Sequence, residues 1–333
     1  MRRLGKILIA VLALLAVLTG AVWVSDPRPG WPDLSALPAP EPGDDPDAWL
    51  HAREGVFDDL VPGTEKAINW AGAPGARTDL AVVYLHGFSA SRREISPVPE
   101  TIAAALGANY FGTRFAGHGR SGGAVPGEAL GDVSVEDWAL DLAEAIAIGR
   151  RLGDRVVLIG TSTGGSLATL AALEPAWQDD IAALVTVSPN FGLRDGQAWT
   201  LDLPYAPHWL PRISGTERGV VSQNPDRALY WTERYPSRAL FPLRTVQRAA
   251  AAADHGAAHV PMLVFYSASD QLVRPEATAR VIQNWGARAD AHVIDNAEDP
   301  GQHVITGDLR SPATNDFVID TTLDWLADLP GLR

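Results

Sequence analysis

Short apolar runs alternate with longer segments of helical spacing along most of this chain. Runs that are apolar throughout, rather than alternating with polar residues, are typical of strands buried on both faces of a parallel sheet. Strands separated by helical segments favour an α/β fold in which helices cover both faces of the sheet. We therefore predict a mainly parallel sheet between two helical layers. The predicted strands are 81–85, 109–114, 156–160, 182–187, 262–266 and 291–294.

Two helices can be bounded from their ends. Ser134 and Asp137 have the spacing of a capping pair, and Gly153 closes the helix that follows them. The last helix is predicted to begin at Ser311-Pro312 and to finish before Pro330. The side chains of this last helix that we expect to face mostly inward are Phe317, Leu323, Trp325 and Leu326.

One interval breaks the alternation of strands and helices. About 70 residues, from Phe191 to His259, separate two of the predicted strands. We predict that this insertion, about 191–259, forms a cap over the carboxyl edge of the sheet, where open α/β folds bind ligands. Most of its aromatic side chains are expected to pack the cap onto the body rather than touch a substrate. They are Phe191, Trp199, Tyr205, Trp209, Tyr230, Trp231, Tyr235 and Phe241.

The N-terminus, residues 1–24, has the pattern of a membrane anchor or a signal segment. The basic start MRRLGK is followed by an apolar run from Ile7 to Val24, whose helical length of about 27 Å approaches the thickness of a bilayer core. A signal peptide cleaved near Thr19-Gly20-Ala21 is the alternative. We favour the anchor because the run continues past that site to Trp23 and Val24. The basic end is expected to stay inside, which predicts an extracytoplasmic domain, periplasmic or at the cell surface. Cleavage would instead give a secreted protein.

Residues 25–46 contain seven prolines and few apolar side chains. Proline-rich segments are extended and semi-rigid, so we predict a linker that holds the domain away from the membrane without joining its core. The folded domain is predicted to span residues 47–333.

Composition excludes several classes of function. The formal net charge of −13 provides no basic excess for nucleic-acid phosphates. The chain has no cysteine, which excludes disulfides, thiol nucleophiles and cysteine metal sites. The histidines outside the motifs discussed below form no metal-ligand cluster with nearby carboxylates, so we predict no metal. These histidines are His51, His208, His255 and His259. We also predict no cofactor, because the serine chemistry described below needs none. The oligomeric state is left open.

The segment VVLIGTSTGG, residues 156–165, is an apolar strand that ends in a G-x-S-x-G turn before a helical stretch. Such a turn strains the backbone of Ser162 and lifts its hydroxyl above the sheet edge. Only hydrogen side chains at Gly160 and Gly164 leave room for the turn. The N-terminus of the following helix favours a developing oxyanion. Ser162 is therefore the predicted nucleophile.

A serine hydroxyl needs a base, and the base needs a carboxylate to orient it. Asp270 follows the strand at 262–266, with Asp295 and Asp299 as rivals. His303 lies in the loop beyond the last strand, whereas His292 sits within that strand. The order serine, aspartate, histidine is that of the α/β-hydrolases.

Four motifs together make the chain resemble α/β-hydrolases of the serine esterase and monoacylglycerol-lipase-like type, from about Ile68 to Leu329. They are Leu85-His86-Gly87-Phe88, the segment AGHGRS at 116–121, the serine turn, and the loops of Asp270 and His303. The resemblance implies that the backbone N–H groups of Phe88 and Thr163 form the oxyanion hole, and that the cap shapes an acyl pocket. His86 and His118 are expected to bond backbone groups.

One departure from the pattern stands after the second strand, where Arg114-Phe115-Ala116 replaces the acidic residue of many relatives. That turn is usually structural, so the departure affects the predicted activity little. We expect hydrolysis of carboxylic esters, with apolar, lipid-like acyl groups, through an acyl-enzyme. The alternatives on the same fold are amide or peptide, thioester and carbon–carbon bond hydrolysis. A non-catalytic tethered scaffold is the alternative from another class.

Overall fold

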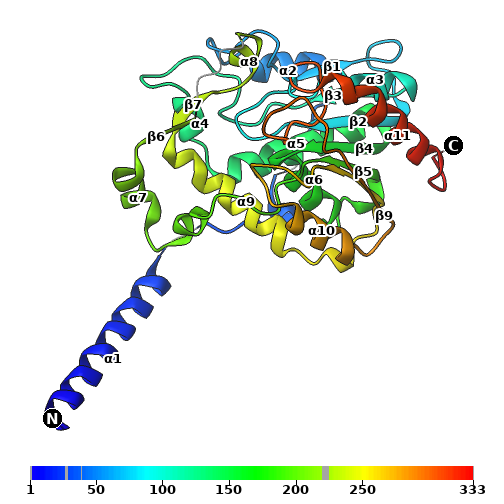
Figure 1. The fold of residues 1–333 in the computed structure, drawn as a ribbon. Helices are drawn as coiled ribbons and strands as arrows, with labels where there is room; N and C mark the ends of the chain where they lie inside the picture. Colours follow the sequence, from blue (N-terminus) through cyan, green and yellow to red (C-terminus); the bar gives the residue numbers. More distant parts are fainter. Residues whose placement is uncertain (1, 27–28, 39, 220–224, 333) are drawn as a thin grey trace.

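A seven-stranded sheet forms the centre of the computed structural model, which describes residues 2–26, 29–38, 40–219 and 225–332 (Figure 1). All neighbouring strands run parallel except the edge strand β1, which pairs antiparallel with β3. In spatial order the strands are β1 (Ala67–Asn69), β3 (Asn109–Gly112), β2 (Thr78–Leu85), β4 (Gly153–Thr161), β5 (Ile181–Val187), β8 (Met262–Tyr266) and β9 (Ala289–Val293).

The six predicted strands are all present, and β8 has the predicted bounds. The ends of the others differ by a few residues; β3, for example, finishes at Gly112 rather than at residue 114. Strand β1 was not predicted, because three residues are too short to show a periodicity. The mainly parallel sheet is confirmed.

Helices cover both faces of the sheet and enclose two apolar cores (Figure 1). Helices α3 (Val98–Ala105) and α11 (Asn315–Ala327) pack together on one face, whereas α5 (Val135–Leu152), α6 (Thr163–Ala172) and α10 (Pro275–Asn284) contribute to the other core. The predicted capping pair is confirmed: Ser134 and Asp137 bond each other's backbone N–H at the start of α5. Short helices α2 (Pro46–Glu54) and α4 (Glu128–Gly131) complete the body.

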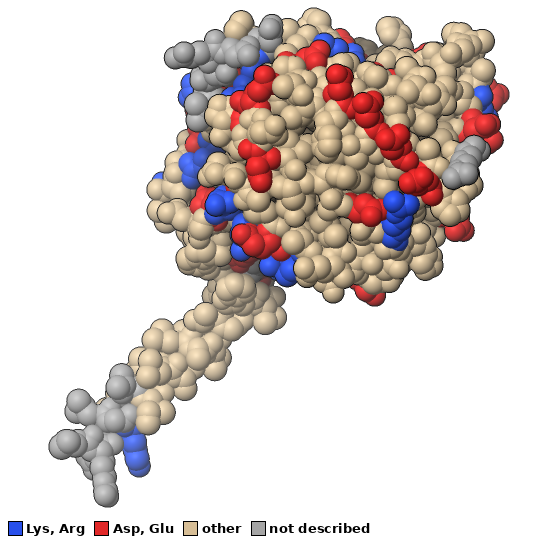
Figure 2. Space-filling model, turned by 45° about the vertical axis from the view of Figure 1, so that its right-hand side comes forward, with Lys and Arg blue, Asp and Glu red and all other residues tan. Residues whose placement is uncertain are grey.

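Helix α11 presents a row of aspartates to solvent, visible as a red diagonal in Figure 2. The four residues follow one another at a spacing of four, which places them on one side of the helix; they are Asp316, Asp320, Asp324 and Asp328.

On the opposite side of α11, Trp325 and Leu326 are buried as predicted. Phe317 is 48% exposed, so the prediction that it faces inward was wrong. Phe317 instead packs at the rim of the core, where its ring makes T-shaped contacts with Phe265 and His292.

The chain leaves the sheet between β5 and β8 and forms a series of small elements (Figure 1). Strands β6 and β7 pair with each other in a separate antiparallel ribbon, and α9 packs on α6. The insertion is therefore attached to the body mainly along the helix that follows Ser162. Its described elements are the 3-10 helix η3 (Ala198–Asp202), α7 (Ala206–Ser214), β6 (Glu217–Gly219), α8 (Pro225–Tyr230), β7 (Arg234–Pro236), the 3-10 helix η4 (Ser237–Ala239), α9 (Leu240–Ala252) and the 3-10 helix η5 (His255–Ala257).

The N-terminal helix α1 (Arg2–Ser25) projects away from the body (Figures 1 and 2). Where α1 ends, the Tyr205 hydroxyl of the insertion donates a hydrogen bond to the carbonyl oxygen of Ser25 at 2.8 Å. Within the described parts of the chain, none of the helices combines the length and the apolarity that crossing a membrane requires. The side chains of residues 1–5, 8 and 10 lie outside the described residues.

The proline-rich segment does join the core, so the prediction that it stays outside was wrong. It forms the 3-10 helix η1 (Leu34–Ala36), and Leu34 is only 6% exposed in the core that α5 and α6 share. Arg151 of α5 donates to the carbonyl oxygens of Gly43 and Asp44. An extended segment needs only a few apolar side chains to lie along a hydrophobic surface, and Leu34 supplies one of them.

Arg114, the residue that departs from the family pattern, is a buried partner of Glu54. Its guanidinium donates two hydrogen bonds to that carboxylate, at 2.8 and 2.7 Å, and one to the carbonyl oxygen of His118. Burial alone would raise the pKa of Glu54, but the hydrogen bonds and charge of Arg114 lower it. Arg114 therefore ties α2 to the turn that follows β3.

Lys66 is another buried charge. Its ammonium lies 3.0 Å from Asp141 Oδ1 and in direct contact with Glu144 Oε1, both on α5. Burial lowers the pKa of Lys66, but the two carboxylates outweigh burial and raise it. Lys66 thus neutralises acids that the surrounding core could not otherwise hold.

Replacing Lys66 with methionine should lower the free energy of unfolding by about 3–5 kcal/mol, because a buried ion pair loses one partner and leaves Glu144 beside Asp141. Urea denaturation followed by circular dichroism measures the change. The control is Asp154→Asn, which removes only an exposed pair with Arg77 and should cost less than about 1 kcal/mol. Equal losses of unfolding free energy in the two variants would mean that the buried ion pair of Lys66 matters no more than an exposed one.

Candidate active site

Ser162 stands at the sharp turn between β4 and α6. Its backbone has φ 51° and ψ −115°, an unfavourable conformation for a residue with a side chain, which costs on the order of 1–3 kcal/mol. A Cβ on Gly164 would overlap the carbonyl oxygen of Leu85, and one on Gly160 would overlap the backbone of Gly164. The predicted turn is therefore present, and its glycines are required by space.

The structure brings Ser162, His303 and Asp270 together. Ser162 Oγ lies 3.0 Å from His303 Nε2, and His303 Nδ1 lies 2.7 Å from Asp270 Oδ2. The three side chains come from three loops at the carboxyl edge of the sheet, and each residue is less than 9% exposed. In this arrangement the imidazole can accept the serine proton while the carboxylate holds the opposite ring nitrogen protonated.

Each of the rival residues has a different partner. Asp299 Oδ2 accepts the backbone N–H groups of His303 and Val304, so it shapes the histidine loop without touching the ring. Asp295 accepts hydrogen bonds from Ser267 and from a backbone N–H in the same loop. His292 lies on β9 and stacks on Phe265.

The carboxylates around His303 determine its charge. Burial alone would lower the pKa of the imidazole, but the hydrogen bond and charge of Asp270 raise it above its ordinary value. Asp270 Oδ1 accepts the N–H groups of Leu272 and Val273 at 2.7 and 2.9 Å, so its carboxylate has little freedom to rotate. His303 is thus prepared to hold a positive charge when it takes a proton.

The backbone N–H groups of Phe88 and Thr163 border the site from two segments, the loop after β2 and the first turn of α6. Within the described residues, neither N–H donates a hydrogen bond to another protein group. His86 lies in the same loop, where its Nε2 accepts the N–H of Phe115 and its Nδ1 donates to the carbonyl oxygen of Gly87 at 2.8 Å. Burial lowers the pKa of His86 well below its ordinary value, as expected for a neutral structural ring.

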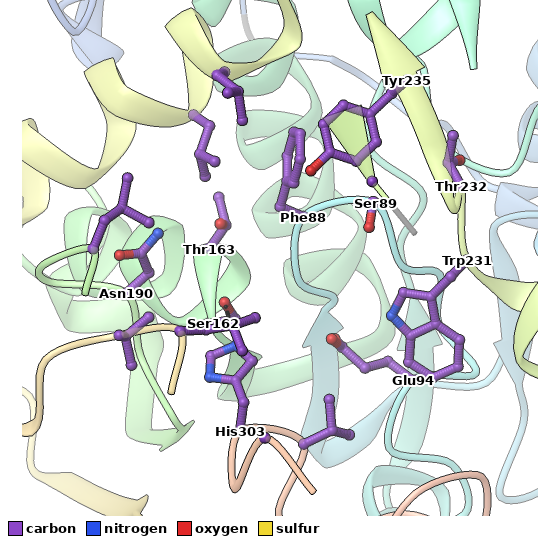
Figure 3. Close-up of a pocket in the computed structure, with 18 of the residues that line it drawn as sticks. Phe88, Ser89, Glu94, Ser162, Thr163, Asn190, Trp231, Thr232, Tyr235 and His303 are labelled. Carbon is purple, nitrogen blue, oxygen red and sulfur yellow. Dashed lines mark hydrogen bonds between the residues drawn. The ribbon is translucent and has the colours of Figure 1, made fainter. Parts of the chain in front are cut away.

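A pocket of about 390 Å³ opens above Ser162, and Figure 3 shows its walls. Thr163 and Asn190 lie on one side of Ser162, and Trp231 lies on the other. The insertion supplies part of this wall, including Trp231 and Tyr235, two of the eight aromatic residues noted in the sequence. The apolar residues of the pocket are Phe88, Leu193, Ala198, Leu201, Trp231, Tyr235, Leu240, Leu243, Leu272, Val273 and Val304.

Among the pocket residues that the sequence did not predict, two polar ones are buried, Asn190 and Glu94. Asn190 follows the strand end of β5, and its Oδ1 is buried with no hydrogen-bond partner in the described part of the chain. Glu94 is 3% exposed, and its carboxyl points toward Ser162 and His303 (Figure 3). The position of Asn190, just after an apolar strand, could have predicted a polar side chain at the carboxyl edge of the sheet. A single glutamate in a polar loop gave none.

In the described segments, no group of three or more histidines, cysteines or acids is arranged to hold a metal ion. The arrangement of Ser162, His303 and Asp270 is instead that of a hydroxyl with a base and an orienting carboxylate.

A mostly parallel sheet whose central strand ends in a strained serine turn, followed by loops that bring an aspartate and a histidine to that serine, defines an α/β-hydrolase. A family model described as serine aminopeptidase, S33, matches residues 76–298, more than half of the chain. The chain belongs to this family.

Solved structures with the same fold include lipases. One comes from work on two metagenome-derived lipolytic enzymes, LipS and LipT (TM-score 0.63, 17% identity, covering 81% of this chain and 100% of the other). Others are the monoglyceride lipase of Saccharomyces cerevisiae (0.59, 14%, 78% and 90%) and the monoacylglycerol lipase of Paleococcus ferrophilus (0.56, 18%, 78% and 96%). At these identities the likeness concerns the fold. No curated protein sequence matches the chain.

Proposed function

We propose that the chain is a serine hydrolase that cleaves carboxylic esters through an acyl-enzyme. The observation that carries this proposal is the hydrogen-bonded series Ser162–His303–Asp270, placed at the bottom of a largely apolar pocket. No cofactor is needed for this chemistry. A non-catalytic scaffold would have no use for a strained serine whose hydroxyl meets a buried, carboxylate-bound histidine.

In the proposed reaction, His303 Nε2 takes the proton of Ser162 as Oγ attacks the ester carbonyl carbon. The carbonyl oxygen becomes an oxyanion that accepts the N–H groups of Phe88 and Thr163. The carbon–oxygen bond to the alcohol then breaks, and His303 returns the proton to the departing oxygen. Water, deprotonated by His303, attacks the acyl-serine, and the acid leaves with Ser162 restored.

The pocket supports apolar acyl groups as substrates. Its lining includes Leu193, Leu240 and Leu243 of the insertion and Leu272 of the body, which offer apolar surface to an acyl chain. Burying a methylene group contributes about 0.8 kcal/mol, so each added carbon that fits should improve kcat/KM until the walls are reached. The lipolytic enzymes among the structures of similar fold support the same substrate class.

Amide or peptide hydrolysis is the second candidate. The family description names an aminopeptidase, and the carboxylate of Asp195 lines the pocket, where it could pair with a substrate amino group. Aminoacyl and peptidyl p-nitroanilides therefore belong in the same substrate panel as the esters.

We expect a fluorophosphonate probe to label the folded protein at Ser162, and p-nitrophenyl esters of medium or long acyl chains to give a higher kcat/KM than the acetate. Labelling identified by peptide mass spectrometry and initial rates across acyl lengths measure both. Absence of labelling would favour the scaffold. A sharp preference for acetate would contradict the apolar acyl substrate, and faster cleavage of anilides would favour the peptidase.

We also propose that the catalytic domain lies on the extracytoplasmic side, held there by the N-terminal segment. What supports this is the basic start of the chain, followed by an apolar run whose side chains, including Leu12, Val17 and Trp23, are exposed on α1. Cell fractionation with an antibody to the domain, with and without protease outside intact cells, provides the test. Recovery in the medium would favour signal cleavage, and recovery in the cytosol would overturn the proposal.

A further inference from the structure

Glu94 is a buried carboxyl in the wall of the active site that the proposed mechanism leaves without a role. It lies in the loop after β2, and its carboxyl end points toward Ser162 and His303 (Figure 3). A Cβ built on Gly87 would lie 2.7 Å from Glu94 Oε1 and 3.2 Å from Ser162 Cβ. Glu94 and Ser162 are therefore separated by little more than the backbone of Gly87.

Glu94 is hydrogen-bonded to the loop that carries Phe88. Its Oε2 accepts the backbone N–H of Gly87 at 2.6 Å. The next peptide group, which joins Gly87 to Phe88, is held through its carbonyl oxygen by His86 Nδ1 at 2.8 Å and by the N–H of Ala90 at 3.2 Å. Since N–H and C=O point in opposite directions in a trans peptide, this leaves the N–H of Phe88 directed away from those partners.

The same carboxylate oxygen is connected to the serine turn. The Tyr84 hydroxyl lies 3.1 Å from Glu94 Oε2 and 3.1 Å from Thr161 Oγ1, and both Tyr84 and Thr161 are fully buried. Because a tyrosine hydroxyl has one proton, Tyr84 can donate to the carboxylate while it accepts from Thr161. Glu94 thus joins Gly87, which precedes Phe88, to Thr161, which precedes Ser162.

We propose that Glu94 is a positioning residue, which fixes the Phe88 loop against the serine turn so that the N–H groups of Phe88 and Thr163 keep the spacing an oxyanion requires. The proposal rests on the proposed function, since the oxyanion is that of the ester reaction. Donors act only when they lie about 2.7–3.1 Å from the developing charge, so a small displacement of one loop loses much of their effect.

The charge of Glu94 adds a pH dependence to this role. Burial raises the pKa of Glu94 to about 7, although the hydrogen bonds of Gly87 and Tyr84 and the charge of His303 oppose the rise. The titratable groups that face it are Tyr84 of β2 and His303 of the loop after β9. An ionised carboxylate accepts stronger hydrogen bonds than a neutral acid and raises the pKa of His303, so its loss acts on both the loop and the base.

The test compares Glu94→Leu, which removes the acceptor, with Glu94→Gln, which keeps an acceptor oxygen but no charge. We expect Glu94→Leu to lower kcat for a p-nitrophenyl ester about 10- to 100-fold with KM changed less than about threefold, because the loss falls on the transition state. Glu94→Gln should lose less in kcat, and the acid limb of its kcat/KM profile should move to lower pH. The control is Glu144→Gln, an equally buried acid at Lys66, which should reduce stability and leave kcat unchanged.

Amide hydrogen exchange at Gly87, measured by NMR or by mass spectrometry of the segment around it, reports how firmly the Phe88 loop is held and does not require ester hydrolysis. Faster exchange in Glu94→Leu supports the proposal, and unchanged exchange overturns it even if the wild-type chain hydrolyses no ester. An active wild type with unchanged kcat in Glu94→Leu also overturns it, as does a change confined to KM. If the leucine variant does not fold, an unshifted pH profile together with full kcat in Glu94→Gln overturns it.

Discussion

Replacing Ser162 with alanine should lower kcat for ester hydrolysis by about 10⁴- to 10⁶-fold. The Oγ that the variant lacks is the atom that lies 3.0 Å from His303 Nε2, and no other hydroxyl has that contact among the described residues. The remaining activity would come from binding and from the N–H groups of Phe88 and Thr163 acting on attack by water. Initial rates with a p-nitrophenyl ester at high enzyme concentration measure the loss.

The matched control is Ser166→Ala in the same helix. Ser166 is fully buried, and its hydroxyl donates to the carbonyl oxygen of Asn190 at 2.7 Å, away from His303. Removing this hydrogen bond should cost about 1 kcal/mol of stability and leave kcat within a few fold of the wild type. Equal activity in Ser162→Ala and wild type would remove Ser162 from the mechanism, and a loss of kcat in Ser166→Ala as large as that in Ser162→Ala would point to disturbed folding instead.

Ser162, Asp270 and His303 could be predicted from the sequence because each stands in a recognisable local pattern. Ser162 follows an apolar strand and is flanked by glycines, and Asp270 and His303 each follow a later predicted strand. Since parallel strands bring their carboxyl ends to one edge, the order along the chain is enough to bring these three residues together. Their distances, and the pairing of Asp299 with backbone rather than with the ring, depend on loop conformations that the sequence pattern does not determine.

Residues whose role depends on distant partners could not be predicted. Glu94 looks like any solvated acid until Tyr84 and Gly87 surround its carboxyl. Leu34 stands in a proline-rich segment, and only the core beneath that segment explains its burial. Arg114 departs from the family pattern, and its meaning appears once Glu54, 60 positions earlier in the chain, is found beside it. In each case the free energy comes from contacts across the fold, which local periodicity does not record.

Replacing Asp270 with asparagine should lower kcat by about 10⁴-fold while the fold is retained. An asparagine Nδ2 can donate to His303 Nδ1 and so favour the tautomer with its proton on Nε2, the atom that must accept the proton of Ser162. The carboxylate also raises the pKa of His303, so its removal lowers that pKa. The acid limb of the kcat/KM profile, below which the base is protonated and inactive, should therefore move to lower pH in the variant.

Asp295→Asn is the control that separates this role from a general loss of negative charge near the site. Asp295 follows the neighbouring strand, but its carboxylate is bonded to Ser267 and the backbone of Ala268 rather than to His303. Its variant should keep kcat and the position of the acid limb. If the acid limb of the kcat/KM profile shifts equally in both variants, the pKa of His303 depends on the total negative charge near the site rather than on Asp270. A limb unchanged in Asp270→Asn, together with nearly full kcat, would mean that the 2.7 Å contact does not control the base.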